Sequence, residues 1–180
     1  MINIWFISDT HFNHNNILSF KNNEDKPLRP FSSVEEMNET MIENWNKLVK
    51  PQDKIYHLGD VILGKAAEFD PILSRLNGKK RLLLGNHDIE KTQHLAKYFD
   101  LKHIFGAKHL NVNGFKCVLS HIPLHTESIK PLGNINIHGH IHCNTVRLPN
   151  TEEPDPRYVN ICVEKTDYKP INLEEIKDQI

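Results

Sequence analysis

The chain has 180 residues, of which 38% are hydrophobic and 25% charged, and its net charge is −1 with neutral histidines. This length suits one domain over residues 1–180 with a real core, and it is too short for two ordinary domains. No apolar run approaches the roughly 20 residues of a membrane span. The charge balance excludes a global basic field that would draw the protein onto long nucleic acid.

The first residues and the cysteines indicate the expected cellular location and exclude two kinds of cysteine-based structure. Residues 1–7 lead directly into a strand-like run, without the basic start and cleavage site of a signal peptide, so we expect a cytoplasmic protein. Cys117, Cys143 and Cys162 are widely spaced and odd in number. This spacing argues against a disulfide framework and against a thiolate zinc module.

The first quarter of the chain predicts a strand, a loop and a long helix. Ile4–Ile7 is apolar and predicts the strand, and a polar loop with one helical turn over residues 15–20 follows. Ser32 and Ser33 can cap a helix whose apolar residues recur every three or four positions, and this helix ends before Pro51.

Alternating elements continue to about residue 100, and strands dominate after it. The next predicted elements are a strand at 54–58, a helix at 65–76, a strand at 81–84 and a helix at 89–98. They are followed by a hairpin of strands 104–112 and 115–119 around Asn113-Gly114, strands at 134–138 and 158–164, and a helical turn at 173–180. This order predicts an α/β sandwich of sheets flanked by helices.

Five short polar clusters each follow an apolar run. They are Ser8-Asp9-Thr10-His11, Gly59-Asp60, Gly85-Asn86-His87-Asp88, Ser120-His121 and Gly139-His140-Ile141-His142. In open α/β sheets, ligands bind outside the carboxyl ends of the strands. Because Asp, His and Asn gather there, the pattern predicts a metal site.

The donor types and their number favour two metal ions. A mixed set of carboxylate, imidazole and amide donors suits zinc, manganese or iron(II) better than calcium. Asp9 and His11 are two positions apart, as are His140 and His142, so each pair can point the same way from an extended strand end. Seven candidates oversupply one tetrahedral ion but fit two ions that share a carboxylate, the usual arrangement for hydrolysing phosphate esters.

In this order the five clusters resemble the signature of the calcineurin-like metallophosphoesterases. The match spans residues 8–142. Residues 9–17, 29–31, 37–60 and 168–176 are similar to a small phage and bacterial branch of that family. The resemblance implies a single domain in which two mixed β-sheets form a sandwich flanked by helices.

The resemblance also implies a role for each motif residue. One metal would be held by Asp9, His11 and His142, the other by Asn86, His121 and His140, and Asp60 would bridge both. His87 would donate a proton or stabilise the transition state, and Asp88 would orient the loop by bonding to His87 or to backbone. Ser120 stands where many relatives have glycine, and serine is small enough for the same turn.

The implied chemistry is attack on the phosphate ester by a metal-bound hydroxide, without a covalent phosphoenzyme. Two divalent transition-metal ions (manganese, iron, zinc or nickel) are expected, with manganese favoured. Three further residues are candidates for substrate binding, each with a structural alternative. They are His14, which could instead be a hydrogen-bonding loop residue, Arg29, which could instead anchor its loop, and His125 after the fourth cluster.

The favoured hypothesis is a phosphodiesterase that acts on a small or nucleotide-type substrate. A phosphomonoesterase, including a protein phosphatase, is second, and a nuclease that uses the basic residues 79–81 is third. A non-catalytic scaffold comes last, because scaffold relatives typically lose ligands, whereas this sequence has the complete set. We expect a phosphoester substrate with nucleic acid less favoured, no membrane partner, and a monomer or a homodimer.

Overall fold

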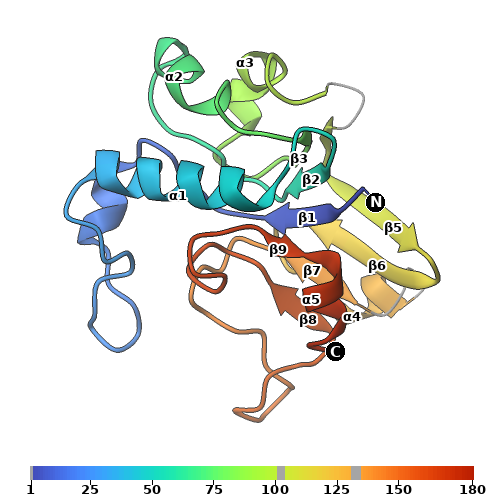
Figure 1. Ribbon diagram of the computed structural model, residues 1–180. Helices are drawn as coiled ribbons and strands as arrows, with labels where there is room; N and C mark the ends of the chain where they lie inside the picture. Colours follow the sequence, from blue (N-terminus) through green and yellow to red (C-terminus); the bar gives the residue numbers. More distant parts are fainter. Residues whose placement is uncertain (1, 101–103, 131–134) are drawn as a thin grey trace.

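The computed structural model describes residues 2–100, 104–130 and 135–180 and arranges their strands in two facing sheets (Figure 1). The first sheet has the order β4-β3-β2-β1-β9 and the second the order β5-β6-β7-β8. The strands of the first sheet are β1 Ile4–Ile7, β2 Lys54–His57, β3 Lys79–Leu83, β4 Ile104–Phe105 and β9 Ile171–Asn172. Those of the second are β5 Ala107–Val112, β6 Phe115–Ser120, β7 Asn136–His138 and β8 Tyr158–Asn160.

Both sheets are mixed. In the first, β1 to β4 run parallel and β9 pairs antiparallel with β1. In the second, β5 and β6 form an antiparallel hairpin, while β6, β7 and β8 run parallel. The sandwich of two mixed sheets predicted from the sequence is therefore confirmed.

The strands of the first sheet are apolar because both of its faces are covered. Successive side chains point to opposite faces, so Ile7 packs towards the helices while Phe6 packs towards the second sheet. Tyr56 stacks on Phe6 at 5.7 Å between ring centroids. Near-continuous apolar runs are what parallel strands require when both faces are buried.

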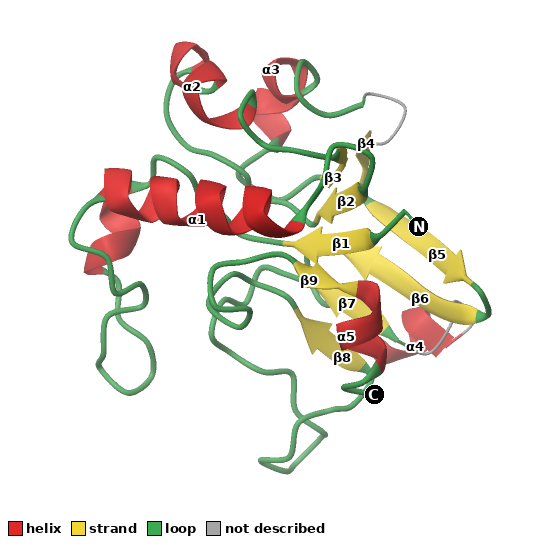
Figure 2. Ribbon diagram, in the orientation of Figure 1, coloured by secondary structure: helices red, strands yellow, loops and turns green. Residues whose placement is uncertain are grey.

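The helices α1, α2 and α3 lie together on the outer side of the first sheet (Figure 2). The helical segments are η1 Asn15–Ser19, α1 Val34–Leu48, η2 Ala66–Glu68, α2 Asp70–Leu73, η3 Ile89–Lys91, α3 Thr92–Leu95, α4 Thr126–Ile129 and α5 Leu173–Lys177. Helix α1 begins as predicted, because Ser33 accepts a hydrogen bond from the Glu36 N–H. Its residues Met41 and Trp45 are fully buried.

Two predicted elements are interrupted in the structure, each beside a residue that breaks regular structure. The predicted helix 65–76 is divided into η2 and α2, where Pro71 has no N–H to continue a helical ladder. The predicted strand 104–112 is divided at Gly106, so β4 joins the first sheet and β5 the second. Strand β9 and helix α4 were not predicted at all.

Strands β7 and β8 are shorter than predicted. Strand β7 covers Asn136–His138, and residue 134 of the predicted strand lies outside the described residues. Strand β8 ends at Asn160, and Cys162 then forms only a bridge to Ser8. Within the described ranges, no helix is long and apolar enough to cross a membrane.

Candidate metal centre

The five polar clusters meet at the carboxyl ends of β1, β2, β3, β6 and β7. Backbone bonds join the loops of neighbouring strands, as where the His11 N–H donates to the Asp60 carbonyl at 3.0 Å. The two sheets are joined here as well, because the His140 N–H donates to Asp9 Oδ2 at 2.9 Å. The sandwich therefore gathers side chains that lie up to 133 positions apart in the sequence, from Asp9 to His142.

Six of these side chains form two adjoining groups, each able to hold a metal ion. One group is Asp9, His11 and His142, and the other is Asp60, His121 and His140. Within each group, the candidate ligand atoms lie within 4.8 Å of one another. Asp60 Oδ2 lies 3.6 Å from His11 Nε2 and 3.4 Å from His121 Nε2, so this oxygen stands between the groups, as a bridging ligand would.

Asn86 extends the second group towards solvent. Its Oδ1 lies 3.1 Å from His121 Nε2, and His140 Nδ1 lies 3.1 Å from the same nitrogen. Asn86 is itself exposed, whereas His121 is buried. All seven ligands predicted from the sequence are thus brought together, and their role as ligands stays a prediction.

Three buried atoms of the first group have no hydrogen-bond partner among the described residues, and one of them is His11 Nδ1. The other two, Asp9 Oδ1 and His11 Nε2, lie 3.8 Å apart. Burial, helped by the nearby Arg29 charge, lowers the pKa of His11 well below its usual value, so the ring is neutral at pH 7. A buried polar atom without a partner costs about 1–3 kcal/mol, and a cation would satisfy both atoms. The donor set fits a divalent metal.

The backbone at the centre adopts a conformation that these residue types rarely take. Eleven non-glycine residues of the described chain have a positive φ, and five of them are candidate ligands, with φ between 46° and 70°. The five are Asp9, His11, Asp60, His140 and His142. Such conformations cost about 1–3 kcal/mol each and cluster at functional sites. Asp and His tolerate this region better than most residues, but five such positions at one centre still need the surrounding contacts to hold them.

Two glycines of the clusters are required by close approach. A Cβ at Gly139 would collide with Ser8 Oγ and with the Asp9 carboxylate, and a Cβ at Gly85 would collide with Asp60 Oδ1. Any side chain at these positions would displace the carboxylates of the two groups. The glycines therefore permit the carboxylates to sit against the neighbouring loop.

Each group has its own hydrogen-bonded support. Asp9 Oδ2 accepts from Ser8 Oγ at 2.6 Å and from Cys162 Sγ at 3.2 Å, in addition to the His140 N–H. Asp60 Oδ1 accepts from the His87 N–H at 2.9 Å, which leaves Oδ2 to face the two histidines. The orientation of both carboxylates is set before any ion binds.

Asp88 acts on the backbone and is too buried to reach substrate. Its carboxylate accepts from the N–H groups of Asp60 at 2.7 Å, Val61 at 3.0 Å and Gly85 at 2.9 Å. Its exposed fraction is 0%. Of the two predicted alternatives, bonding to backbone is the one observed, which gives Asp88 a positioning role.

Arg29, for which the sequence left substrate binding and loop anchoring open, makes anchoring contacts in the structure. The side chain is buried, and its guanidinium donates to the Thr10 carbonyl at 2.7 Å and to the Asp9 carbonyl at 2.5 Å. Its Nε donates to Glu164 Oε1 at 2.8 Å. All of these contacts lie behind the ligands, so the anchoring alternative for Arg29 is the one observed.

Glu164 was missed by the sequence reasoning. Its Oε1 lies 3.0 Å from His142 Nδ1, and the carboxylate is almost fully buried. Hydrogen bonding to His142 and the charge of Arg29 outweigh burial and lower the pKa of Glu164 below its usual value. An acidic residue that ends the apolar run 161–163 was the available signal.

His87 and His14 lie beside the first group. Their ring centroids are each 5.4 Å from that of His11. His87 is exposed and lines a cavity of about 360 Å³ together with Asn86, Ile89, Glu90 and Lys91. His14 is half-buried and packs edge-on against Phe20. Contact between these histidines and a substrate remains a prediction.

His125 is the N-cap of α4. Its Nδ1 accepts a hydrogen bond from the Glu127 N–H at 3.3 Å, and the side chain is exposed. This capping contact gives His125 a structural role, and the predicted substrate contact has no further support.

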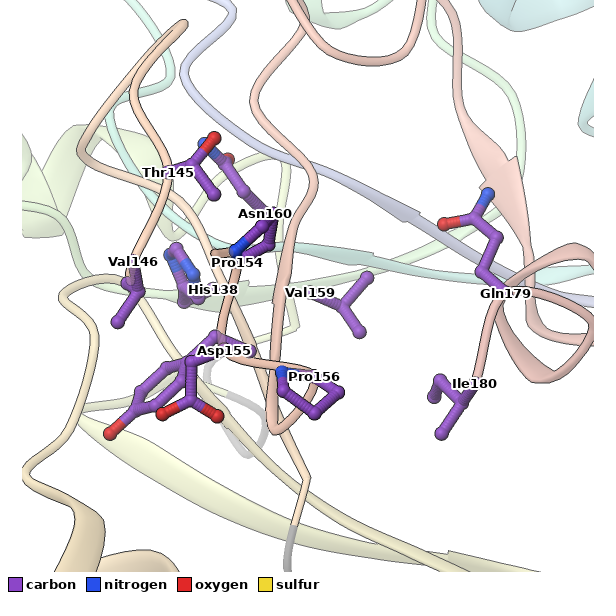
Figure 3. A pocket seen from close by; sticks show the side chains of 11 residues that line it. His138, Thr145, Val146, Pro154, Asp155, Pro156, Val159, Asn160, Gln179 and Ile180 are labelled. Atoms are coloured by element: carbon purple, nitrogen blue, oxygen red, sulfur yellow. The ribbon is translucent and has the colours of Figure 1, made fainter. Parts of the chain in front are cut away.

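A separate cavity of about 370 Å³ lies against β7 and β8 and is lined by His138, Thr145, Val146 and Asn160, among others (Figure 3). Burial lowers the pKa of His138 to about 4, so this ring is neutral at pH 7. None of the seven candidate ligands lines this cavity. It is therefore distinct from the metal centre.

Comparison with known proteins identifies several similar chains. A family model described as calcineurin-like phosphoesterase matches residues 2–165. An uncharacterised protein of Methanocaldococcus jannaschii is 39% identical over 180 residues, which cover 98% of this chain and 90% of the relative. The Gene 66 protein of Mycobacterium phage L5 is 29% identical over 169 residues, which cover 79% of this chain and 78% of the relative. A solved protein of unknown function from Aquifex aeolicus is 30% identical, with a TM-score of 0.75 and 100% of both chains covered.

Proposed function

The chain belongs to the calcineurin-like phosphoesterase family, and from that premise we propose that it is a two-metal phosphodiesterase for a small or nucleotide-type substrate. The observation that carries the proposal is the Asp60 carboxylate, whose Oδ2 stands between two groups of ligands. Two-metal sites of this kind hydrolyse phosphate esters by clamping the attacking and leaving oxygens.

In this proposal the two ions have separate ligands and one shared ligand. Asp9, His11 and His142 would hold one ion, Asn86, His121 and His140 would hold the other, and Asp60 would be shared by both. When bound, the ions supply the positive charge that activates water and neutralises the phosphoryl oxygens. We favour manganese, because carboxylate and amide oxygens accompany the imidazoles in the donor set.

In this proposal, protein side chains position the reacting groups and supply the proton for the leaving oxygen. His87 lies on the exposed side of the centre, where its imidazole can hold the proton that the leaving oxygen takes up. The backbone N–H of His87 donates to Asp60 Oδ1, which couples the position of His87 to the bridging carboxylate. Asp88 holds the Asp60 and Gly85 backbone, so the loops of both groups stay in register.

The charge around the centre favours a diester over a monoester. A phosphate monoester carries up to two negative charges near pH 7, because its second pKa is about 6, whereas a diester carries one. Arg29 is buried and paired with Glu164, so its guanidinium is not offered to a substrate. Lys91 Nζ donates to the carbonyls of His87 and Ile62. Apart from the ions, the centre therefore offers a substrate no free guanidinium among the described residues to bind a second phosphate charge, which supports the choice of the singly charged ester.

The nuclease alternative loses support from the position of the basic residues. Lys79 and Lys80 stand at the amino end of β3, and Asn86 and His87 follow its carboxyl end. A five-residue strand extends about 16 Å, so this basic patch lies at the opposite edge of the sheet from the metal centre. A nucleic acid bound there would not be presented to the metal groups.

The test compares hydrolysis of bis-p-nitrophenyl phosphate and p-nitrophenyl phosphate by the manganese-loaded protein. We expect faster turnover of the diester, a loss of about 10²–10⁴-fold in His87→Ala, and no change in Lys79→Ala, whose side chain is exposed at the far edge. Faster turnover of the monoester would move the protein to the phosphatases. Two bound ions without turnover of either ester would contradict the proposed general diesterase activity and leave a narrow specificity or a scaffold as the alternatives.

A further inference from the structure

Behind the first group of ligands lies a fully enclosed ion pair, Arg29–Glu164. The exposed fractions of the two side chains are 0% and 3%, and Arg29 Nη2 lies 2.8 Å from Glu164 Oε1. The partners are 135 positions apart in the sequence. Burying two charges is costly and seldom stabilises a fold more than an apolar pair would, so the function of this pair lies in what it holds in place.

The Glu164 carboxylate is shared between Arg29 and His142 through one oxygen. Oε1 accepts from Arg29 Nε at 2.8 Å and lies 3.0 Å from His142 Nδ1, whereas the buried Oε2 has no partner among the described residues. A pair built only for charge neutralisation commonly uses both oxygens of the carboxylate. The geometry therefore indicates that Glu164 bridges Arg29 to His142.

The contact with Glu164 determines which nitrogen of His142 is free for a cation. A carboxylate only accepts, so His142 Nδ1 is the donor in this bond. The lone pair of the neutral ring is then on Nε2, the nitrogen that remains for an ion. Carboxylates that fix metal-binding histidines in this way typically contribute 10–100-fold to metal affinity.

The other end of the pair holds the backbone of the same group. The Arg29 guanidinium donates to the carbonyls of Asp9 and Thr10, the segment in which Asp9 and His11 both have a left-handed backbone. One ion pair thus supports three ligands of one group. The second group relies on other contacts, such as that of His121 Nδ1 with the Leu58 carbonyl at 2.8 Å.

We propose that Arg29 and Glu164 are positioning residues that selectively control occupancy of the metal position formed by Asp9, His11 and His142. This inference rests on the proposed function, because it presumes two metal positions. Arg29 and Glu164 hydrogen-bond to residues of the first group, and their hydrogen bonds do not include His121 or His140. Disrupting the pair should therefore convert a two-ion protein into a one-ion protein.

The experiment measures Mn²⁺ binding by titration calorimetry and by electron paramagnetic resonance on protein that has been freed of metal with a chelator. For Glu164→Gln we expect roughly 10–100-fold weaker binding of one ion, unchanged binding of the other, and a spectrum that changes from coupled to isolated manganese. Arg29→Lys keeps the charge but lacks the fork that reaches Glu164 and two carbonyls, so we expect a smaller loss at the same position.

Asp155→Asn is the matched control. Asp155 also has an exposed fraction of 3% and pairs with Arg157, using both oxygens, but it lies outside both ligand groups. We expect this variant to bind two ions. Thermal unfolding of the metal-free proteins, followed by circular dichroism, verifies that each variant is folded, and Arg29→Lys serves if Glu164→Gln is not.

Two results would overturn the inference. Retention of both ions at wild-type affinity by the folded variants would show that the pair has no role in positioning. Equal weakening of both ions would show that the pair stabilises the fold as a whole. If wild-type protein bound fewer than two ions, the proposed function itself would fail, and this outcome is distinguishable because it appears before any substitution is made.

Discussion

Two buried aspartates at opposite ends of the first sheet differ in how their oxygens are used. Asp53 precedes β2 at the amino edge, and Asp9 follows β1 at the carboxyl edge; both have an exposed fraction of 0%. Both Asp53 oxygens are bonded, to the N–H groups of Asn3 and Lys50 and to Trp5 Nε1. Asp9 Oδ1 has no partner among the described residues.

For this reason, the pKa values of the two aspartates are shifted in opposite directions. Burial acts to raise the pKa of Asp53, but its N–H donors outweigh burial and the pKa lies below the usual value. At Asp9 burial prevails, and the pKa is raised. Both oxygens of the Asp53 carboxylate accept hydrogen bonds within the protein, whereas Asp9 Oδ1 accepts none from the described residues and is left for a cation. The comparison separates a residue that stabilises the sheet from one that the fold holds ready for a ligand.

The largest expected effect is on activity, in Asp9→Asn. Loss of a ligand charge should remove about 4 kcal/mol of transition-state stabilisation, about a thousandfold in turnover of the diester. The metal-free variant should unfold at the same or a higher urea concentration, since the unpaired buried charge is gone. A marked destabilisation of the metal-free variant would break the comparison, because Asp9 would then be structural like Asp53.

The next largest expected effect is the increase in the free energy of unfolding when metal binds. An ion at a hundred times its dissociation constant adds about 2.7 kcal/mol to the free energy of unfolding, which is roughly 5–10 °C in melting temperature at this size. We expect this shift for wild type and Asp53→Asn on addition of Mn²⁺, and a smaller one for Asp9→Asn. Equal shifts in all three proteins, measured by calorimetry, would place the ions elsewhere.

The expected effects of Asp53→Asn are the opposite of those of Asp9→Asn: lower stability and unchanged turnover. An amide cannot accept from all three donors, so a buried N–H loses its partner at a cost of about 1–3 kcal/mol. Turnover at saturating metal should not change. Asp167→Asn is the control, because its carboxylate is 85% exposed and should matter by less than about 0.5 kcal/mol. Urea unfolding of the three proteins measures the difference.

The pH dependence of that difference is the smallest effect. Because the folded pKa of Asp53 is lowered, its contribution is complete above the unfolded value of about 3.9 and is lost as the pH falls through the folded pKa. Wild type and Asp53→Asn should therefore differ in unfolding free energy more at pH 6 than at pH 3. A difference that grew towards pH 3 would contradict the contacts described for Asp53.

Sequence reasoning succeeded where local signals coincide with the fold. Strand β1 and helix α1 were predicted because apolar periodicity and a serine cap agree with the packing. The candidate ligands were found because each follows a strand, and parallel strands bring their ends to one edge. The left-handed backbone at His140 and His142 carries no such signal, since tertiary contacts impose it.

The errors arise from contacts that are distant in sequence. Arg29 was left open between substrate and anchor because its partner Glu164 lies beyond every motif. Strand β9 has two residues and forms only because β1 offers an edge to pair with. Single-sequence patterns do not contain such pairings, and the structure supplies them.

The late position of β9 in the chain has a consequence for synthesis on the ribosome. Strand β1 is made well before Ile171–Asn172, the strand that pairs with its outer edge. Until then β1 presents unpaired backbone groups, the feature that promotes association between chains. His142 and Glu164 also follow Asp9 and His11 by more than 130 positions, so a nascent chain without them has neither a paired β1 edge nor a complete first ligand group. Covering of the β1 edge and completion of the metal centre should thus both wait for segments that are made long after β1.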